Sequence, residues 1–111
     1  MHEMSITQGI IDICESHASG RRVLSIDVEI GELSSVVPDA VAFCFEACSH
    51  DTLLEGASLN IIRIPGSGHC LDCDANTPLA AIFGACQHCG SYQVTIVTGE
   101  EMRVREIEVD E

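Results

Sequence analysis

Four cysteines in two identical pairs are the residues best suited to metal chemistry in this sequence. Cys70 and Cys73 form one C-x-x-C pair, and Cys86 and Cys89 form a second after twelve intervening residues. Each pair forms a tight turn whose sulfurs point at one centre, so two facing turns supply four thiolates in a tetrahedron. Zn²⁺ accepts that geometry, and no position is left open for water. The spacing therefore predicts one structural zinc ion, not a catalytic one.

Three other interpretations of these cysteines compete with zinc. An iron ion in a rubredoxin-like site would use the same four sulfurs. A thioredoxin-like redox pair has one C-x-x-C near a βαβ pattern, so two pairs argue against it. Structural disulfides do not suit a reducing compartment. His69 and His88 adjoin ligand cysteines; we expect solvated neighbours, with supporting or substitute-ligand roles as the alternative.

The first residues offer a different kind of metal site. The chain begins Met1-His2-Glu3. A free terminal amine, the amide nitrogen of His2 and its imidazole can chelate a metal in adjoining rings, and the Glu3 amide could supply a fourth nitrogen. Planar nitrogen ligation suits Ni(II) or Cu(II), not tetrahedral zinc. The alternative is that His2 belongs to an unstructured start and Glu3 is an acidic residue favoured at a helix start.

The composition argues against several functional classes. The chain has 111 residues, with 18 Asp and Glu against 5 Arg and Lys, and a formal net charge of −13. Nucleic-acid binding depends on basic side chains that neutralise phosphates, so we expect no nucleic-acid partner. No apolar stretch approaches the ~20 residues that span a bilayer, so we expect no membrane association. An acidic protein suits cations and basic partner surfaces instead.

The cysteine count and the first residues predict the compartment. Seven Cys is an odd number, and the chain shows no charged segment followed by an apolar run, hence no signal peptide. A cytoplasmic protein fits, with the paired cysteines bound to metal and the others reduced. Those others, Cys14, Cys44 and Cys48, lie on apolar helix faces and are expected to pack in the core.

Hydrophobic periodicity predicts the elements that position these residues. A helix is expected over about residues 5–19, with Ser5 as N-cap and Gln8 completing a capping box, so the first four residues would form an arm in front of it. Pro38-Asp39 opens a second helix. Strands are predicted from alternating apolar residues over 24–30, 59–64, 92–96 and 102–109, the last with a slip in phase near Arg105-Glu106.

These elements predict an α+β fold, with two helices packed on a small, mainly antiparallel three-stranded sheet and an inserted zinc-ribbon-like unit. So short a chain leaves little apolar material for a second core, so the inserted unit needs a metal to fold. We expect a nickel-binding α/β domain from residues 1–65 plus 95–111, and a zinc-binding domain from residues 66–94. The acidic stripe of Asp27, Glu29 and Glu32 is expected to be a solvated sheet face, with docking of a basic partner as the alternative.

Together these features resemble the HypA/HybF family of hydrogenase nickel-incorporation proteins. The similarity runs through the whole chain, with one departure at Gln87, where the family often has Pro after the third zinc cysteine. The segments that carry the resemblance are Met1-His2-Glu3, Cys14-Glu15, Ile30-Gly31-Glu32-Leu33-Ser34, Pro38-Asp39, Phe43 to Ala47, Glu55-Gly56-Ala57, the two C-x-x-C pairs with Cys89-Gly90-Ser91, Gly99-Glu100-Glu101, and Ile107-Glu108-Val109.

The resemblance implies a nickel metallochaperone that delivers Ni(II) during maturation of nickel-iron hydrogenase, and in some organisms also serves urease. His2 would be the key nickel ligand, with Met1 and Glu3 contributing through their nitrogens and Asp39 near the site. Zinc would be held tightly by the four cysteines. The implied partners are a maturation GTPase, the hydrogenase large subunit and urease accessory proteins.

The expected mechanism is ligand exchange, because an exposed, incomplete site can pass nickel to a better one. The sequence shows no open metal site, no activated nucleophile and no phosphate loop, so we expect no enzyme. The alternative function is a zinc-ribbon protein-interaction adaptor with no nickel role. Only the adaptor tolerates an N-terminal extension, since only the chaperone needs a free terminal amine.

Overall fold

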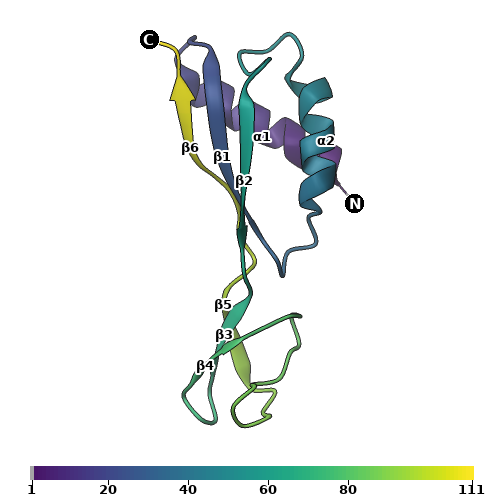
Figure 1. Cartoon of the computed structure of the whole chain (residues 1–111), viewed down its shortest axis with the longest axis vertical. Coiled ribbons are helices and arrows are strands. Elements are labelled where there is room, and N and C mark those ends of the chain that lie inside the picture. Colours follow the sequence, from purple (N-terminus) through teal and green to yellow (C-terminus); the bar gives the residue numbers. More distant parts are fainter. Residues whose placement is uncertain (1) are drawn as a thin grey trace. The chain divides into compact units, whose positions relative to one another are not determined.

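The computed structural model describes residues 2–111, so the prediction for Met1 falls outside the described residues. The described part of the chain divides into two compact units. The first comprises Met1–Glu29, Val36–Ile62 and Arg103–Glu111, and the second comprises Ile30–Ser35 and Arg63–Met102. The elements follow in the order α1 (Glu3–Ala18), β1 (Val23–Gly31), α2 (Pro38–Ser49), β2 (Ser58–Ile64), β3 (Ser67–Cys70), β4 (Asn76–Pro78), β5 (Val94–Thr98) and β6 (Met102–Val109) (Figure 1).

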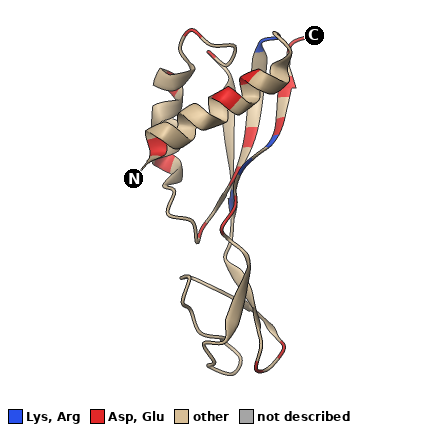
Figure 2. Ribbon diagram, turned by 180° about the vertical axis from the view of Figure 1, so that it is seen from behind, with Lys and Arg blue, Asp and Glu red and all other residues tan. Residues whose placement is uncertain are grey.

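The first unit is built on a three-stranded sheet in the order β2-β1-β6. Strand β1 runs antiparallel to β6 and parallel to β2, so the sheet is mixed. Helix α1 crosses one face of this sheet, and α2 packs against α1 beside β2 (Figures 1 and 2). The predicted fold class is confirmed. The parallel pair arises because α2 connects β1 to β2, as in a βαβ crossover.

Apolar side chains from both helices and from β1 form the core of the first unit. Helix α1 contributes Ile11 and Cys14, and α2 contributes Val41; none is more than 1% exposed. Cys14 therefore packs in the core as predicted. Cys44 and Cys48 are only partly buried, and the thiol of Cys48 lies 3.1 Å from the thioether of Met4.

Helix α1 begins earlier than the sequence predicted. Its N-cap is His2, whose carbonyl accepts a hydrogen bond from the backbone N–H of Ile6 at 2.9 Å. Ser5 therefore lies inside the helix, and the side chain of Gln8 donates to Asp12 at 3.0 Å. The predicted four-residue arm and capping box are wrong. The acidic Glu3 in the first turn already favours the helix start through the helix dipole.

Strands β1, β2 and β6 follow the predicted alternation closely, whereas the short strands β3 and β4 were not predicted and β5 is shifted. Strands β2 and β6 have nearly the predicted bounds, whereas β5 begins at Val94, two residues later than expected. The slip in β6 is confirmed, because adjacent Arg105 and Glu106 are both exposed while Val104 and Ile107 on either side are half-buried.

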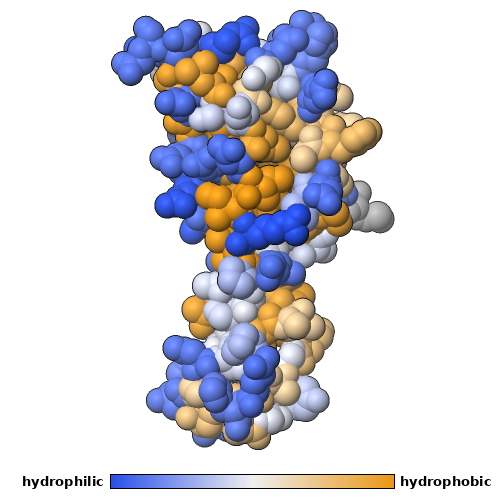
Figure 3. All heavy atoms as spheres, in the orientation of Figure 1, coloured by the Kyte–Doolittle hydropathy of each residue, from blue (hydrophilic) through white to orange (hydrophobic). Residues whose placement is uncertain are grey.

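The acidic residues of β1 are not simply solvated, contrary to the prediction. Glu29 is only 8% exposed and accepts a hydrogen bond from the guanidinium of Arg103 on β6. Asp27 accepts a hydrogen bond from Asn60 on β2 at 3.0 Å. Neighbouring strands place polar partners beside both carboxylates, which offsets the cost of burial. The sheet face not covered by α1 carries hydrophobic side chains between hydrophilic ones (Figure 3).

The second unit contains the antiparallel sheet β4-β3-β5. The segment Ile30–Ser35, which includes the end of β1, joins this unit: the backbone N–H of Gly31 donates to the carbonyl of Glu101 and that of Leu33 to Gly99, each at 2.7 Å. A Cβ atom at Gly31 would lie 2.0 Å from the carbonyl oxygen of Gly99, so only glycine allows this approach. The buried hydrophobic side chains of this unit are few, among them Leu33, Leu79 and two cysteines.

Candidate metal centres

The structure brings the four predicted zinc ligands together in the second unit. Their sulfur atoms all lie within 4.8 Å of one another. The sulfurs of Cys70 and Cys89 are 3.6 Å apart, and those of Cys73 and Cys86 are 3.7 Å apart. Disulfide sulfurs would be about 2.05 Å apart. Tetrahedral bonds of about 2.3 Å to zinc place sulfurs about 3.8 Å apart, so the geometry fits a tetrathiolate metal site.

Both C-x-x-C turns use the same backbone hydrogen bonds. In the first, the N–H of Asp74 donates to the carbonyl of Cys70, and the N–H of Cys70 donates to Ala75, each at 2.9 Å. In the second, Gly90 donates to Cys86 and Cys86 to Ser91, each at 2.8 Å. The fourth residue after the first cysteine is left-handed in both turns, with φ of 62° at Asp74 and 79° at Gly90. Two equivalent turns thus present their cysteines in the same way.

Hydrogen bonds between distant residues hold the two turns in register. The N–H of Leu71 donates to the carbonyl of Gln93 at 2.8 Å, and the hydroxyl of Ser91 donates to the carboxylate of Asp72. The buried hydroxyl of Thr77, on β4, accepts the N–H of Gln87 at 3.0 Å. A proline in place of Gln87 has no N–H to donate, so this departure from the family pattern creates a contact.

The sulfurs influence one another's protonation. Burial raises the pKa of the Cys86 thiol, but N–H groups of Cys89 and His88 and neighbouring thiols lower it to about 6. For Cys73, the N–H of Ala75 lowers the pKa, but burial and the surrounding cysteines raise it to about 12. Four thiolates repel one another without a cation, and a bound divalent metal stabilises them together. The donor set therefore fits zinc.

The two histidines beside the cysteines differ in their surroundings. The ring of His69 contacts Asp74 through Nε2 at 2.8 Å and Asn76 through Nδ1 at 3.3 Å. Hydrogen bonds to Asn76 and Asp74 raise the pKa of His69. One ring nitrogen thus contacts the residue after Cys73, and the other contacts the first residue of β4. His88 is exposed, and its backbone N–H donates to the sulfur of Cys86 at 3.3 Å.

Two of the predicted nickel ligands, His2 and Glu3, lie at the start of α1, in the first unit. His2 is exposed and directly precedes the helix, and Glu3 is its first residue. The carboxylate of Glu3 accepts a hydrogen bond at 3.4 Å from the N–H of Val37, the N-cap residue of α2. Asp39 lies in the first turn of α2. N–H groups of a first helical turn have no acceptor within their helix, so the Glu3 nitrogen is not needed for the helix ladder.

The supporting residues of the cysteine site were missed from the sequence. Thr77, Asp72 and Ser91 act through contacts with residues 10 to 19 positions away, and no short motif marks such pairs. The cluster of His50, Asp51 and Glu55 at the end of α2 was also missed. The spacing of these three residues could have indicated the cluster. Asp51 and Glu55 follow the helix-ending His50 by one and five positions, so the turn after the helix can bring them back to the histidine.

Comparison with known proteins decides the family. The family described as "Hydrogenase/urease nickel incorporation, metallochaperone, hypA" matches residues 1–109. The chain belongs to the HypA family. A protein named hydrogenase maturation factor HypA from Geobacter metallireducens is 57% identical over 110 residues, which cover 99% of this chain and 100% of that protein. The protein of the same name from Geobacter sulfurreducens is 56% identical with the same coverage.

Solved structures of HypA proteins have the same fold. The solution structure of the Ni metallochaperone HypA from Helicobacter pylori matches with a TM-score of 0.70 and 31% identity, covering 98% of this chain and 97% of that chain. These similarities confirm the resemblance inferred from the sequence. Among the described residues, no helix is both long and apolar enough to cross a membrane.

Proposed function

We propose that this HypA-family chain carries Ni(II) at its N-terminus and delivers it during maturation of nickel-iron hydrogenase, with urease as a second possible recipient. The observation that carries the proposal is the exposed position of His2, directly in front of α1 and within a whole-chain match to a nickel metallochaperone family. Met1 would supply its amine, His2 its amide nitrogen and imidazole, and Glu3 its amide nitrogen.

Transfer is by ligand exchange, not catalysis. An exposed site at a helix start has no enclosing cage, so a partner's ligands can replace its own one at a time. Protonation of the His2 imidazole competes with nickel, so acid favours release. The partners would be a maturation GTPase, the hydrogenase large subunit and urease accessory proteins, in the cytoplasm.

The four cysteines would hold one structural zinc ion. Zinc neutralises the thiolates and joins the two C-x-x-C turns in a unit with few buried hydrophobic residues. The same unit exposes large apolar side chains that suit contacts with a maturation partner: Leu71, Ile82, Phe83 and Tyr92.

The test is nickel binding by calorimetry on zinc-loaded protein with its native N-terminus, beside His2→Ala and a form extended by two residues before Met1. The extension removes the free amine at the chelate but keeps every side chain, which makes it the matched control. We expect both changes to remove terminal nickel binding while zinc content stays constant. Unchanged binding in both forms would instead favour the zinc-ribbon adaptor.

A further inference from the structure

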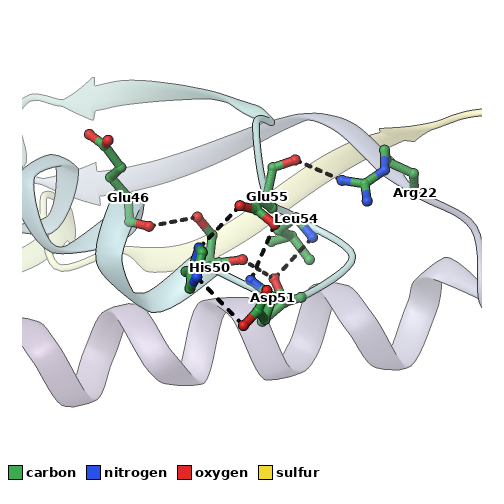
Figure 4. Close-up of polar contacts among 8 residues, drawn as sticks. Arg22, Glu46, His50, Asp51, Leu54 and Glu55 are labelled. Carbon is green, nitrogen blue, oxygen red and sulfur yellow. Dashed lines mark hydrogen bonds and ion pairs between the residues drawn. The ribbon is translucent and has the colours of Figure 1, made fainter.

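Three metal-ligating side chains meet where α2 ends, in the first unit. His50 is the C-cap residue of α2, and its Nδ1 lies 3.1 Å from a carboxylate oxygen of Glu55. Its Nε2 lies 3.5 Å from a carboxylate oxygen of Asp51. One ligand atom from each residue lies within 4.8 Å of the other two (Figure 4). This cluster contains one imidazole and two carboxylates, and it is separate from the four cysteines and from His2.

The backbone that carries these side chains is firmly anchored. Leu54 is fully buried, and its N–H donates to the hydroxyl of Thr52 at 3.1 Å. The carbonyl of Glu55 accepts a hydrogen bond from Arg22 at 2.8 Å, and one oxygen of its carboxylate accepts from the N–H of Asp51 at 3.3 Å. The cluster therefore sits on a short, ordered turn, and little reorganisation would be needed to bind an ion.

We propose that His50, Asp51 and Glu55 form a weak, exchangeable site for a divalent transition-metal ion such as Ni²⁺. Imidazole nitrogen with carboxylate oxygen suits nickel and zinc, whereas magnesium and calcium prefer oxygen alone. The donors are available from solvent, since the side chains of His50 and Asp51 are 68% and 85% exposed. Water would complete the coordination, so the ion exchanges readily.

Two electrostatic features favour a cation at this place. The C-terminal end of a helix carries partial negative charge, and the cluster lies at that end of α2. The chain as a whole has a formal net charge of −13, and Asp and Glu outnumber Arg over the ribbon (Figure 2). Arg22 opposes these effects, but it contacts the backbone carbonyl of Glu55 and leaves the carboxylate to His50 and Asp51.

The cluster shares a groove with the start of α1. A groove of about 830 Å³ within the first unit is lined by Met4 from α1 and by His50 and Glu55 from the turn after α2. Met4 follows the proposed nickel ligands His2 and Glu3 directly in sequence. His50 and Glu55, two of the three proposed ligands, therefore line the same groove as Met4. The inference itself does not depend on the terminal site, because its ligands are different.

The alternative is that these contacts form without an ion, with the His50 ring hydrogen-bonded to the Glu55 carboxylate and lying near that of Asp51. The two states respond differently to nickel. In the ion-free state, added Ni²⁺ has no effect at this turn. In the proposed state, a nickel ion with nitrogen, oxygen and water ligands is high-spin and paramagnetic, and it broadens the amide signals of residues 50–56. A planar nitrogen-ligated nickel at the terminus is diamagnetic and leaves its neighbours sharp.

The experiment is an NMR titration of full-length, zinc-loaded His2→Ala protein with Ni²⁺, and with Mg²⁺ for comparison. Added to this background are Asp51→Asn, which replaces a charged carboxylate with a weaker neutral amide ligand, and His50→Ala, which removes the imidazole. The matched controls are Glu46→Gln, which makes the same charge change on α2, and His17→Ala, which removes an exposed histidine of α1. Figure 4 shows the carboxylate of Glu46 directed away from the cluster.

We expect Ni²⁺, but not Mg²⁺, to broaden residues 50–56 in the His2→Ala background. Asp51→Asn and His50→Ala should each weaken this effect by about tenfold or more, and the two controls should leave it unchanged. Broadening that is absent, that centres on the cysteine turns, or that persists in Asp51→Asn and His50→Ala would overturn the proposal. None of these results bears on the terminal site, which is tested separately in protein that keeps His2.

Discussion

The carboxylate of Glu3 accepts a hydrogen bond from the backbone N–H of Val37, which joins the first residue of α1 to the N-cap of α2. Two helix N-termini therefore share one negative side chain, and both dipoles favour it. The proposed nickel terminus is thus held beside α2 through the side chain of Glu3, while the main-chain nitrogen of Glu3 remains the proposed ligand.

This division of roles predicts how substitutions of Glu3 affect nickel. Glu3→Ala and Glu3→Gln keep the amide nitrogen, so we expect nickel affinity to stay within roughly threefold of the unmodified protein. His2→Ala should remove terminal binding. Amide hydrogen exchange at Val37 should become faster in Glu3→Ala, because its N–H loses this acceptor. Calorimetry measures the nickel affinity, and amide hydrogen exchange measures the loss of the hydrogen bond at Val37. A loss of nickel as large as that of His2→Ala would show that the carboxylate itself binds the metal.

The pair of Glu29 and Arg103 predicts a stability effect in the first unit. The Glu29 side chain is 11% exposed and the Arg103 side chain 68% exposed, so Arg103→Ala leaves a nearly buried carboxylate without this partner. We expect the free energy of unfolding to fall by about 1–2 kcal/mol, less than for a fully buried pair. Arg105→Ala, on the same strand, is the matched control and should change it by less than about 0.5 kcal/mol. Urea unfolding measures both. Equal effects of the two substitutions would mean that the pair contributes nothing specific.

Local patterns predicted most of the fold and the cysteine site. The C-x-x-C spacing identified Cys70, Cys73, Cys86 and Cys89, which converge in the structure, because two short turns determine the geometry of each pair. The alternation of apolar and polar residues identified β1, β2 and β6, because a strand with one buried face has a hydrophobic period of two residues in the sequence.

The wrong or missing predictions concern residues whose structure depends on contacts with residues far away in the sequence. Glu29 looks like a solvated strand residue until Arg103, 74 positions away, pairs with it. Ser5 looks like a helix cap, but the helix extends back to Glu3, whose carboxylate meets Val37, 34 positions away. The contact between Thr77 and Gln87 depends on how two turns face each other. Such contacts carry no periodic signal, so pattern analysis does not find them.

Zinc removal should affect the two units differently. The second unit has few buried hydrophobic residues besides its cysteines, so its fold depends on the metal. We expect a strong chelator to collapse the NMR dispersion of residues 63–102 while the helices of the first unit keep their far-ultraviolet circular dichroism signal. Cys86→Ser should have the same effect without chelator. A chelated protein that keeps the dispersion of both units would show that the cysteine site is not needed for folding.

Thr77 should influence zinc retention without binding the metal. Its buried hydroxyl accepts the N–H of Gln87, the residue after a proposed ligand. Thr77→Val has nearly the same shape but cannot accept this bond, so we expect zinc affinity to fall by roughly tenfold. Competition with a chromophoric chelator measures it. Thr95→Val, an exposed threonine of β5, is the matched control and should retain zinc normally. Equal affinity of the two variants would remove Thr77 from the support of the site.

The buried thiol of Cys14 predicts a stability change in alkaline solution. Burial raises the pKa of Cys14 to about 11, whereas an unfolded cysteine titrates near about 8.5. Above pH 8.5 the unfolded chain loses this proton while the folded chain keeps it, so stability should fall between about pH 8.5 and 11. Cys14→Ala lacks the thiol and this contribution, although the cavity makes it about 1 kcal/mol less stable at neutral pH. Urea unfolding of both proteins across this range should show the unmodified protein losing its advantage as pH rises, so that Cys14→Ala becomes the more stable of the two toward pH 11. Parallel curves would mean that Cys14 ionises equally in the folded and unfolded states.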